Sequence, residues 1–296
     1  MKKLIVVFLI FSGLYSCEDV IEVDLPPDVP KINIDALFRV DINEEFVPVV
    51  VKITMTNSFM NEVPVTNVDN IIIIIEELDE FDRIIDTQFS VLAQVDEGSG
   101  IYVPDPNTSR DERIRTSILD KKLRFWLSIR HEDKFYLAQT RYVPTVPIES
   151  IVQGDGKLFN DDETEVIVTF TDDPERDDFY VFDFDFTEYL VTEDKFYKGQ
   201  EFTFSYYYDR TFESGTEIEI SIMGSDDIFY RYMDQLIEQR DLEGPFQTPV
   251  STVRGNIFDA TGIDNRDLFD NVERPGEFPL GYFAIVQEYK YPLIIE

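Results

Sequence analysis

With 296 residues, of which 43% are hydrophobic and 14% aromatic, the chain has enough apolar material for one large or two ordinary folded domains, and this excludes intrinsic disorder. Its 60 acidic residues against 26 basic ones give a net charge of −34, and such a surface repels phosphate backbones, so we expect no nucleic-acid partner. The single cysteine, Cys17, excludes any disulfide within the chain and needs another explanation.

Residues 1–16 are typical of a signal peptide. Lys2 and Lys3 give a positive start, and the eight residues from Leu4 to Phe11 are all apolar. A run of this length is too short to cross about 30 Å of hydrocarbon as a permanent helix. We therefore expect this segment to direct export and then to be removed.

The residues before Cys17 resemble a lipobox. Leu14 supplies an aliphatic residue three positions before the cysteine, and Ser16 supplies a small residue directly before it. Tyr15 is larger than the residue usual at its position, so an ordinary secretory signal with an incidental cysteine stays open. We expect a diacylglycerol and acyl lipid on Cys17, which would hold the protein on a membrane.

Residues 17–30 form an acidic and then proline-rich segment. The acidic side chains that we expect to act as an export signal are Glu18, Asp19, Glu22 and Asp24. In lipoproteins of the Bacteroidota, such a stretch beside the lipidated cysteine resembles the signal for the outer face of the outer membrane; the alternative is a solvated linker. Pro26, Pro27 and Pro30 predict a stiff, extended tether. Because no later apolar run approaches about 18 residues, we expect membrane attachment through the lipid only.

Residues 31–145 alternate between short strands and turns. Hydrophobic residues recur at every second position in the first strands, and two later runs flank a polar turn at Arg130–Asp133. Ile71–Ile75, with five β-branched residues in a row, predicts a central strand covered on both faces. The other expected strands are Lys31–Phe38, Phe46–Met55, Ile101–Val103, Leu123–Ile129 and Lys134–Gln139. This spacing predicts an immunoglobulin-like β-sandwich.

Residues 146–296 predict a second β-rich domain. Pro144 and Pro147 mark the boundary, because two prolines in four residues cannot continue a paired strand. A helix is expected at 226–240, where Ser225 can cap it and apolar residues recur at helical spacing. The expected strands are Glu165–Phe170, Phe179–Phe186, Phe202–Tyr208 and Glu217–Met223. We therefore expect a mainly β fold, in which an N-terminal immunoglobulin-like sandwich precedes a β-rich domain with one amphipathic helix.

The sequence contains no convincing catalytic residues. His131 is the only histidine and is expected in an exposed turn, and no motif of a zinc metalloprotease, a serine hydrolase or a dithiol oxidoreductase occurs. We expect no metal ligand and no cofactor apart from the lipid on Cys17. Two acidic loops, Asp172–Asp178 and Asp264–Asp270, leave calcium binding open beside the interpretation as solvated loops. Tyr206–Tyr208 leaves open an aromatic face for sugars or a partner, with core packing as the alternative.

Three short motifs carry a resemblance to a known family. They are Gly244-Pro245-Phe246, Gly255-Asn256-Ile257 and Gly281-Tyr282-Phe283. Together with the lipobox and the two β regions, they make the chain similar to a family of Bacteroidota outer-membrane lipoproteins that is classed as a domain of unknown function. The chain departs from that family in a longer acidic segment at Phe258–Pro279 and a less glycine-rich first half. Because glycine permits positive φ and close backbone approach, we interpret the motifs as fold-defining turns.

The resemblance implies a partner role at the cell surface. Members of the family look like surface lipoproteins that are often encoded with TonB-dependent outer-membrane transporters. We therefore expect a non-enzymatic, lipid-anchored accessory of an outer-membrane β-barrel, acting in uptake or in barrel assembly. Two alternatives stay open: an extracellular lipoprotein that binds a glycan, a peptide or calcium, and an enzyme that uses paired carboxylates.

Overall fold

The part of the chain that the structure describes is mainly β, as expected. The computed structural model describes residues 30–56, 67–240, 252–261 and 278–296. Outside these ranges lie the signal peptide, Cys17 with its acidic neighbours, Gly244-Pro245-Phe246 and the acidic loop at Asp264–Asp270. No helix among the described residues is long and apolar enough to cross a membrane.

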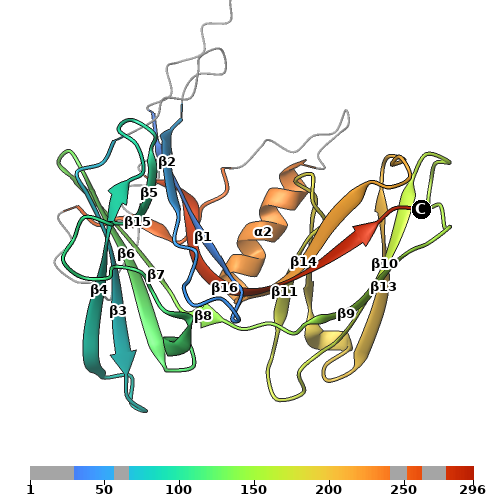
Figure 1. Cartoon of the computed structure of the whole chain (residues 1–296), viewed down its shortest axis with the longest axis horizontal. Helices are drawn as coiled ribbons and strands as arrows, with labels where there is room; N and C mark the ends of the chain where they lie inside the picture. Colours follow the sequence, from blue (N-terminus) through green and yellow to red (C-terminus); the bar gives the residue numbers. More distant parts are fainter. Residues whose placement is uncertain (1–29, 57–66, 241–251, 262–277) are drawn as a thin grey trace, which may run out of the picture.

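Sixteen strands, two short 3-10 helices and one α-helix occur in the described residues (Figure 1). Thirteen of these strands form one large sheet: β1 (Ile32–Val40), β2 (Val51–Met55), β3 (Asn70–Leu78), β4 (Ile84–Gln94), β5 (Ile101–Pro104), β6 (Leu123–His131), β7 (Lys134–Thr140), β8 (Tyr142–Val143), β11 (Phe179–Asp183), β12 (Tyr189–Glu193), β14 (Glu217–Ser225), β15 (Ile257–Asp259) and β16 (Leu280–Ile294). The second sheet consists of β9 (Ile148–Gln153), β10 (Thr164–Thr171) and β13 (Glu201–Tyr208). The helices are η1 (Thr116–Ile118), η2 (Asp194–Phe196) and α2 (Asp227–Arg240).

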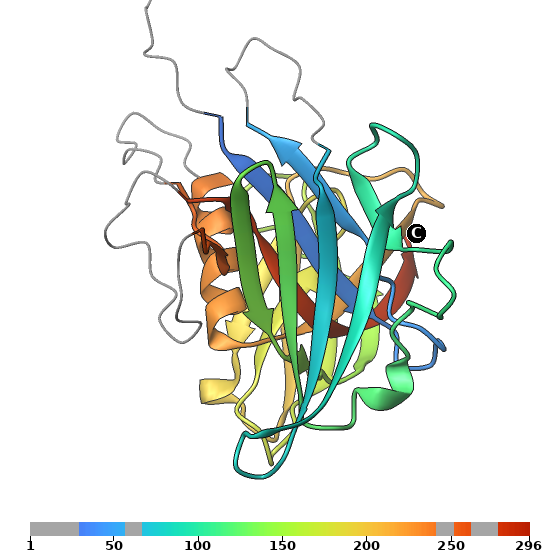
Figure 2. The same cartoon turned by 90° about the vertical axis from the view of Figure 1, so that its left-hand side faces the viewer.

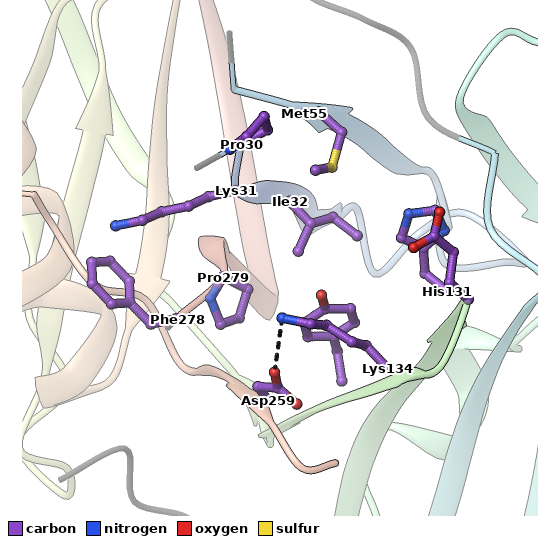
Figure 3. Close-up of a pocket in the computed structure, with 11 residues that line it drawn as sticks. Pro30, Lys31, Ile32, Met55, His131, Lys134, Asp259, Phe278 and Pro279 are labelled. Carbon is purple, nitrogen blue, oxygen red and sulfur yellow. Dashed lines mark ion pairs between the residues drawn. The ribbon is translucent and has the colours of Figure 1, made fainter. Parts of the chain in front are cut away.

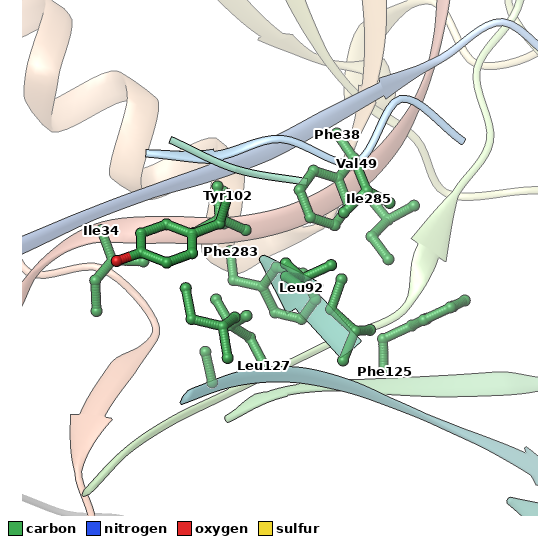
Figure 4. Packing of buried hydrophobic residues seen from close by; sticks show 14 of the residues in the cluster. Ile34, Phe38, Val49, Leu92, Tyr102, Phe125, Leu127, Phe283 and Ile285 are labelled. Carbon is green, nitrogen blue, oxygen red and sulfur yellow. The ribbon is translucent and has the colours of Figure 1, made fainter. Parts of the chain in front are cut away.

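The first half of the chain forms a curled sheet, which we define as β1–β7, β15 and the first half of β16. Its strands follow the order β16-β1-β2-β5-β4-β3-β6-β7-β15, and Figure 2 shows β3, β6 and β7 in front of β1 and β16. Side chains from alternate positions form an inner core that is largely isoleucine and valine, part of which is drawn in Figure 4. Because these strands belong to one continuous sheet, the immunoglobulin-like sandwich expected for residues 31–145 is not confirmed.

Two strands of the curled sheet differ from the sequence-based prediction. β2 begins at Val51 and not at Phe46, although Val47 and Val49 are still buried. The backbone N–H of Val47 donates to the carbonyl of Ile114, which lies outside the named strands, so residues 46–50 are not part of β2. β3 is an inner strand, but only one of its faces is fully buried, so the expectation of two covered faces is wrong.

The second half of the chain forms a sandwich, which we define as β9–β14 and the second half of β16. The sheet of β9, β10 and β13 packs face to face on β11, β12, β14 and β16, and both sheets contribute to one core rich in phenylalanine and tyrosine. The ring of Phe170 lies 5.2 Å from that of Tyr180 and 5.5 Å from that of Phe182, measured between centroids. Two stacked sheets are therefore found in the second half of the chain.

β16 is shared by the curled sheet and the sandwich. Its residues Leu280–Gln287 pair in parallel with β1, and its residues Glu288–Ile294 pair antiparallel with β14. In Figure 1 this strand runs without a break from one half of the molecule to the other. Strand pairing thus crosses the boundary expected between residues 145 and 146, because β16, from the second half of the chain, pairs with β1, from the first half.

Helix α2 packs beside β16, between the curled sheet and the sandwich (Figure 1). Its buried residues are Phe229 and Met233, and the Phe229 ring lies 4.9 Å from the ring of Tyr282 on β16. The helix was expected at 226–240 and begins one residue later. The side chain of Asp226, and not that of Ser225, accepts a hydrogen bond from the Phe229 backbone N–H at 2.7 Å and caps the helix.

Candidate functional site

A pocket of about 670 Å³ lies at the end of the curled sheet where β1 begins (Figure 3). Its walls come from the start of β1, the end of β2, the turn between β6 and β7, β15, and the residues just before β16. The lining residues are Pro30, Lys31, Ile32, Met55, His131, Glu132, Lys134, Tyr136, Asp259, Phe278 and Pro279. Strands that are distant in the sequence thus meet at one concave surface.

Most of this pocket is lined by apolar side chains. Ile32 on β1 and Tyr136 on β7 are buried, with 3% and 6% of their surface exposed. Figure 3 shows Ile32 and Met55 on one side of the pocket and Phe278 and Pro279 on another. An apolar concave surface with a few polar groups is the usual composition of a small-ligand site.

The Tyr136 hydroxyl is a polar group at the wall of this pocket. Burial, followed by the nearby carboxylates of Asp259 and Glu132, raises the pKa of Tyr136 to about 12, so the hydroxyl is protonated at neutral pH. Within the described residues, this hydroxyl has no hydrogen-bond partner, and it lines the pocket. A hydroxyl in this position can donate a hydrogen bond to a bound ligand.

Positive side chains also gather at the pocket, although the protein is strongly acidic. The Lys31 ammonium lies 3.8 Å from the centroid of the Phe278 ring, and within the described chain no carboxylate lies at ion-pair distance from it. Lys134 approaches the buried carboxylate of Asp259 at 3.5 Å, which is longer than a close charge-assisted hydrogen bond. The pocket can therefore offer positive charge to a bound anion.

A second hollow, of about 820 Å³, lies beside Arg39 at the other end of β1. The Arg39 guanidinium donates to Asp183 at 2.7 Å and also pairs with the buried carboxylate of Glu288. Asp183, on β11, is largely buried and binds Arg39, although strict alternation with the buried Phe182 and Phe184 would turn it towards water. Lys290, the other cation that lines this hollow, pairs with Glu219 at 2.7 Å, so both cations of the hollow are engaged by carboxylates, unlike Lys31 within the described chain.

The family motifs that the structure describes lie where β16 meets the rest of the curled sheet. The Asn256 side chain donates to the Phe283 carbonyl at 2.8 Å and accepts from the Phe283 N–H at 2.9 Å, while also donating to the Gln139 carbonyl on β7 at 3.2 Å. A Cβ on Gly255 would lie 1.7 Å from the Gly281 carbonyl oxygen. We call this contact of Gly255 and Asn256 with β16 the seam, because it joins β7 to β16.

The remaining motif residues have packing roles beside the seam. Gly281 has a φ of +94°, and a Cβ there would lie 1.9 Å from the Ile34 carbonyl oxygen. Ile257 and Phe283 are buried in the core of the curled sheet, and Tyr282 packs on helix α2. The seam lies a few residues from the pocket, since Asp259 follows Ile257 and Pro279 precedes Gly281.

His131 lies at the pocket and not in an exposed turn. β6 and β7 pair as far as His131 and Lys134, so the connecting turn is only Glu132 and Asp133, with Glu132 at a φ of +53°. His131 is consequently the last residue of β6, half-buried, and lines the pocket.

The tyrosines at Tyr206–Tyr208 do not form an exposed aromatic face. Tyr208 is fully buried and its hydroxyl donates to the Phe184 carbonyl at 2.7 Å. The hydroxyls of Tyr206 and Tyr207 donate to Glu188 and Glu165. The three tyrosines, which lie on β13, are therefore engaged within the sandwich.

The acidic loop at Asp172–Asp178 is held by hydrogen bonds within the protein. The Tyr180 hydroxyl lies within hydrogen-bond distance of both Asp172 and Asp178, and Arg176 pairs with Asp178 at 2.9 Å. Within the described ranges, no group of three or more histidine, cysteine, aspartate or glutamate residues could hold a metal ion.

No protein-family model matches this chain, and no curated protein matches it. The resemblance to the Bacteroidota lipoproteins stays a prediction that depends on the motifs named above.

Sequence reasoning missed Lys31, Tyr136, Asp259 and Phe278 as residues of one site. They come together because β15 pairs antiparallel with β7 and β16 pairs in parallel with β1. Each of these pairings joins segments more than a hundred residues apart, and local periodicity carries no information about such distances. The one local signal was the position of Lys31 directly after Pro30, at the end of the tether.

Proposed function

We propose that the chain is a surface-exposed outer-membrane lipoprotein that acts as a non-enzymatic accessory of an outer-membrane β-barrel, of the TonB-dependent transporter or the barrel-assembly type. The observation that carries this proposal is the position of the pocket. Pro30, the last residue of the proposed tether, is itself part of the pocket lining. The pocket is the surface that we propose for contact with the partner.

The length of the tether supports contact near the membrane. Thirteen residues lead from Cys17 to Pro30. Even when fully extended, a segment of this length spans at most about 45 Å. A lipid on Cys17 would therefore keep the pocket close to the outer loops of a neighbouring barrel, whereas the far end of the sandwich would face away.

The chemistry of the pocket supports binding better than catalysis. His131 has no carboxylate hydrogen-bonded to its ring in the described residues, and no serine or cysteine lines the pocket. Asp259 accepts a hydrogen bond from the Thr261 N–H and approaches Lys134, which gives it a structural role. Of the two carboxylates that line the pocket, Glu132 and Asp259, the second is therefore already engaged within the protein and is a poor candidate for a glycosidase acid or nucleophile.

Co-purification from native membranes tests the proposed function. The lipidated chain, extracted in mild detergent, is expected to retain an outer-membrane β-barrel that mass spectrometry identifies. Cys17→Ala is the matched control, because it removes the lipid and leaves the pocket unchanged; we expect it to lose both the membrane and the barrel. Recovery of the lipidated chain without any barrel protein would count against the proposal, as would an unmodified sulfur on Cys17.

A second candidate function is direct binding of a small extracellular ligand. It is favoured by the Tyr136 hydroxyl, which has no partner in the described part of the chain, and by the Lys31 ammonium; both residues line a largely apolar pocket. Saturable ligand binding by the purified chain, without any barrel protein present, would support this function. The two candidates are compatible, because an accessory of a transporter can hold the cargo that the transporter takes up.

A further inference from the structure

We propose that the pocket at Lys31 binds a carboxylate that is attached to an apolar body. This inference deepens the proposed binding role of the same pocket, because it names the chemistry of the ligand. The carboxylate could belong to a small organic acid or to the carboxyl terminus of a peptide, and the test below separates these two sources.

The argument begins with the charges at the pocket. The whole chain has more than two acidic residues for each basic one, but among the lining residues two lysines stand against two carboxylates. One of those carboxylates, Asp259, is 4% exposed in its side chain and is occupied by the Thr261 N–H as well as by Lys134. The positive charge of Lys31 is left without a carboxylate among the described residues.

The Phe278 ring helps to hold the Lys31 ammonium in place. Lys31 Nζ lies 3.8 Å from the centroid of this ring. Cations over an aromatic face are held by the ring but still carry their full charge. An anion in the pocket would therefore meet a positive potential at the end where Figure 3 shows Lys31 extending towards Phe278.

The Tyr136 hydroxyl favours a carboxylate over a simple halide or a purely apolar ligand. It is a protonated donor at neutral pH, it belongs to a residue that is only 6% exposed, and it has no acceptor within the described chain. A carboxylate offers two oxygens, so it can accept from a hydroxyl and an ammonium together. Its apolar body would cover Ile32, Met55 and Pro279, which line the same pocket.

Binding of hippurate to the full, lipidated chain in detergent tests this inference. Hippurate carries a carboxylate on an aromatic amide, and hippuramide is its neutral match with the same body. Isothermal titration calorimetry at neutral pH is expected to show saturable binding of hippurate and roughly tenfold weaker binding of hippuramide, as expected for one charge-assisted contact. Equal affinities of hippurate and hippuramide would overturn the inference, as would the absence of saturable binding by both hippurate and the peptide probe named below.

Three variants place the ligand in this pocket. Lys31→Gln and Tyr136→Phe are each expected to weaken hippurate binding by roughly five- to tenfold, because each removes one polar contact. Lys52→Gln is the matched control: Lys52 lies on the adjacent strand β2, is exposed, and does not line the pocket. An equal effect of Lys52→Gln, or unchanged binding by Lys31→Gln, would contradict the placement.

Chemical protection gives an independent readout that does not require a variant. Brief acetylation of the wild-type chain, followed by mass spectrometry, is expected to modify Lys31 more slowly when hippurate is present, while Lys52 reacts at an unchanged rate. Acetyl-Ala-Phe with a free or an amidated carboxyl terminus serves as the peptide probe. Stronger protection by the free peptide than by hippurate would assign the site to peptide termini, and the reverse would assign it to small acids; no protection by either would overturn the inference.

If neither hippurate nor the peptide binds while a barrel protein still co-purifies, the ligand chemistry alone is wrong and the proposed function stands.

Discussion

The row of tyrosines in the sandwich differs from Tyr136 in the curled sheet in how the hydroxyls are bonded. In the sandwich, the hydroxyls of Tyr180, Tyr197, Tyr206, Tyr207 and Tyr208 all have hydrogen-bond partners. In the curled sheet, the Tyr136 hydroxyl faces a pocket and has no partner in the described part of the chain. A tyrosine hydroxyl that lines a pocket without a partner among the described residues can serve a ligand there.

The two halves also differ in how their cores are completed. The sandwich core lies between two stacked sheets whose aromatic rings fill the space between them. The curled sheet instead needs its two ends joined, and the seam at Gly255 and Asn256 supplies that contact. We therefore expect the curled sheet to be more sensitive to single substitutions at the seam than the sandwich is at its hydrogen-bonded tyrosines.

Gly281→Ala is expected to have the largest effect. Its φ of +94° costs an alanine about 1–2 kcal/mol. The Cβ would also lie 1.9 Å from the Ile34 carbonyl oxygen. Moving that backbone costs a further ~1–3 kcal/mol. Urea unfolding should therefore show a loss of roughly 2–5 kcal/mol in the free energy of unfolding.

Gly98→Ala is the matched control for this substitution. Gly98 has a φ of +80°, but nothing lies within 4 Å of the position of its Cβ. Only the conformational cost of about 1–2 kcal/mol should remain. Equal losses for the two variants would show that the close approach at β16 contributes nothing.

Asn256→Ala is expected to have the next largest effect. It leaves the N–H and the carbonyl of Phe283 on β16 without their side-chain partner. An unpaired backbone group that is partly buried costs about 1–3 kcal/mol, so we expect a loss of roughly 2–3 kcal/mol in the free energy of unfolding. Asn43→Ala is the control, because Asn43 is exposed and bonds only locally to Asp41; its effect should be below about 0.5 kcal/mol.

A pair of tyrosine substitutions tests the comparison directly. Tyr208→Phe removes a buried hydrogen bond to the Phe184 carbonyl and should lower the free energy of unfolding by about 1–2 kcal/mol. Tyr136→Phe removes a hydroxyl without a partner and should change it by less than about 0.5 kcal/mol. A loss of the same size in Tyr136→Phe would mean that the hydroxyl is already satisfied, which would remove the contrast between the two halves.

The smallest expected effect is a pH dependence in the sandwich. Burial raises the pKa of Asp178 above its usual 3.8. A carboxyl group with a raised pKa in the folded state binds a proton on folding, so its contribution is favourable at low pH and is lost as the pH rises from about 4 through the raised pKa. In Asp178→Asn, the free energy of unfolding measured with urea should fall less between about pH 4 and pH 7. Glu175→Gln, at an exposed position, should leave this pH dependence unchanged.

The strands and the helix could be predicted from the sequence because they depend on local periodicity. The pattern of apolar residues predicted β1, β6, β7, β10 and β14, and the helical spacing of apolar residues such as Phe229 and Met233 predicted α2. The helix cap was assigned to Ser225 and is Asp226, since either side chain can serve and only the backbone geometry selects one.

The arrangement of the strands and the pocket could not be predicted in the same way. The sequence contains no sign that β16 would add to β1 across more than two hundred residues, or that β15 would add to β7. The glycines at Gly255 and Gly281 were interpreted as turns from their conformational freedom, and the structure shows the contacts that require them. Lys31, His131 and Tyr136 become neighbours only after these pairings form, so the site depends on the tertiary structure.

Site-specific photo-crosslinking in intact cells tests the central claim that the pocket end of the curled sheet is the binding surface. A benzophenone side chain is placed either at Glu132, on the exposed rim of the pocket, or at Phe159, which is 84% exposed on the sandwich. The account predicts that Glu132 crosslinks to an outer-membrane β-barrel protein identified by mass spectrometry and that Phe159 does not. Crosslinks from Phe159 alone, equal crosslinks from both positions, or none from Glu132 would contradict it.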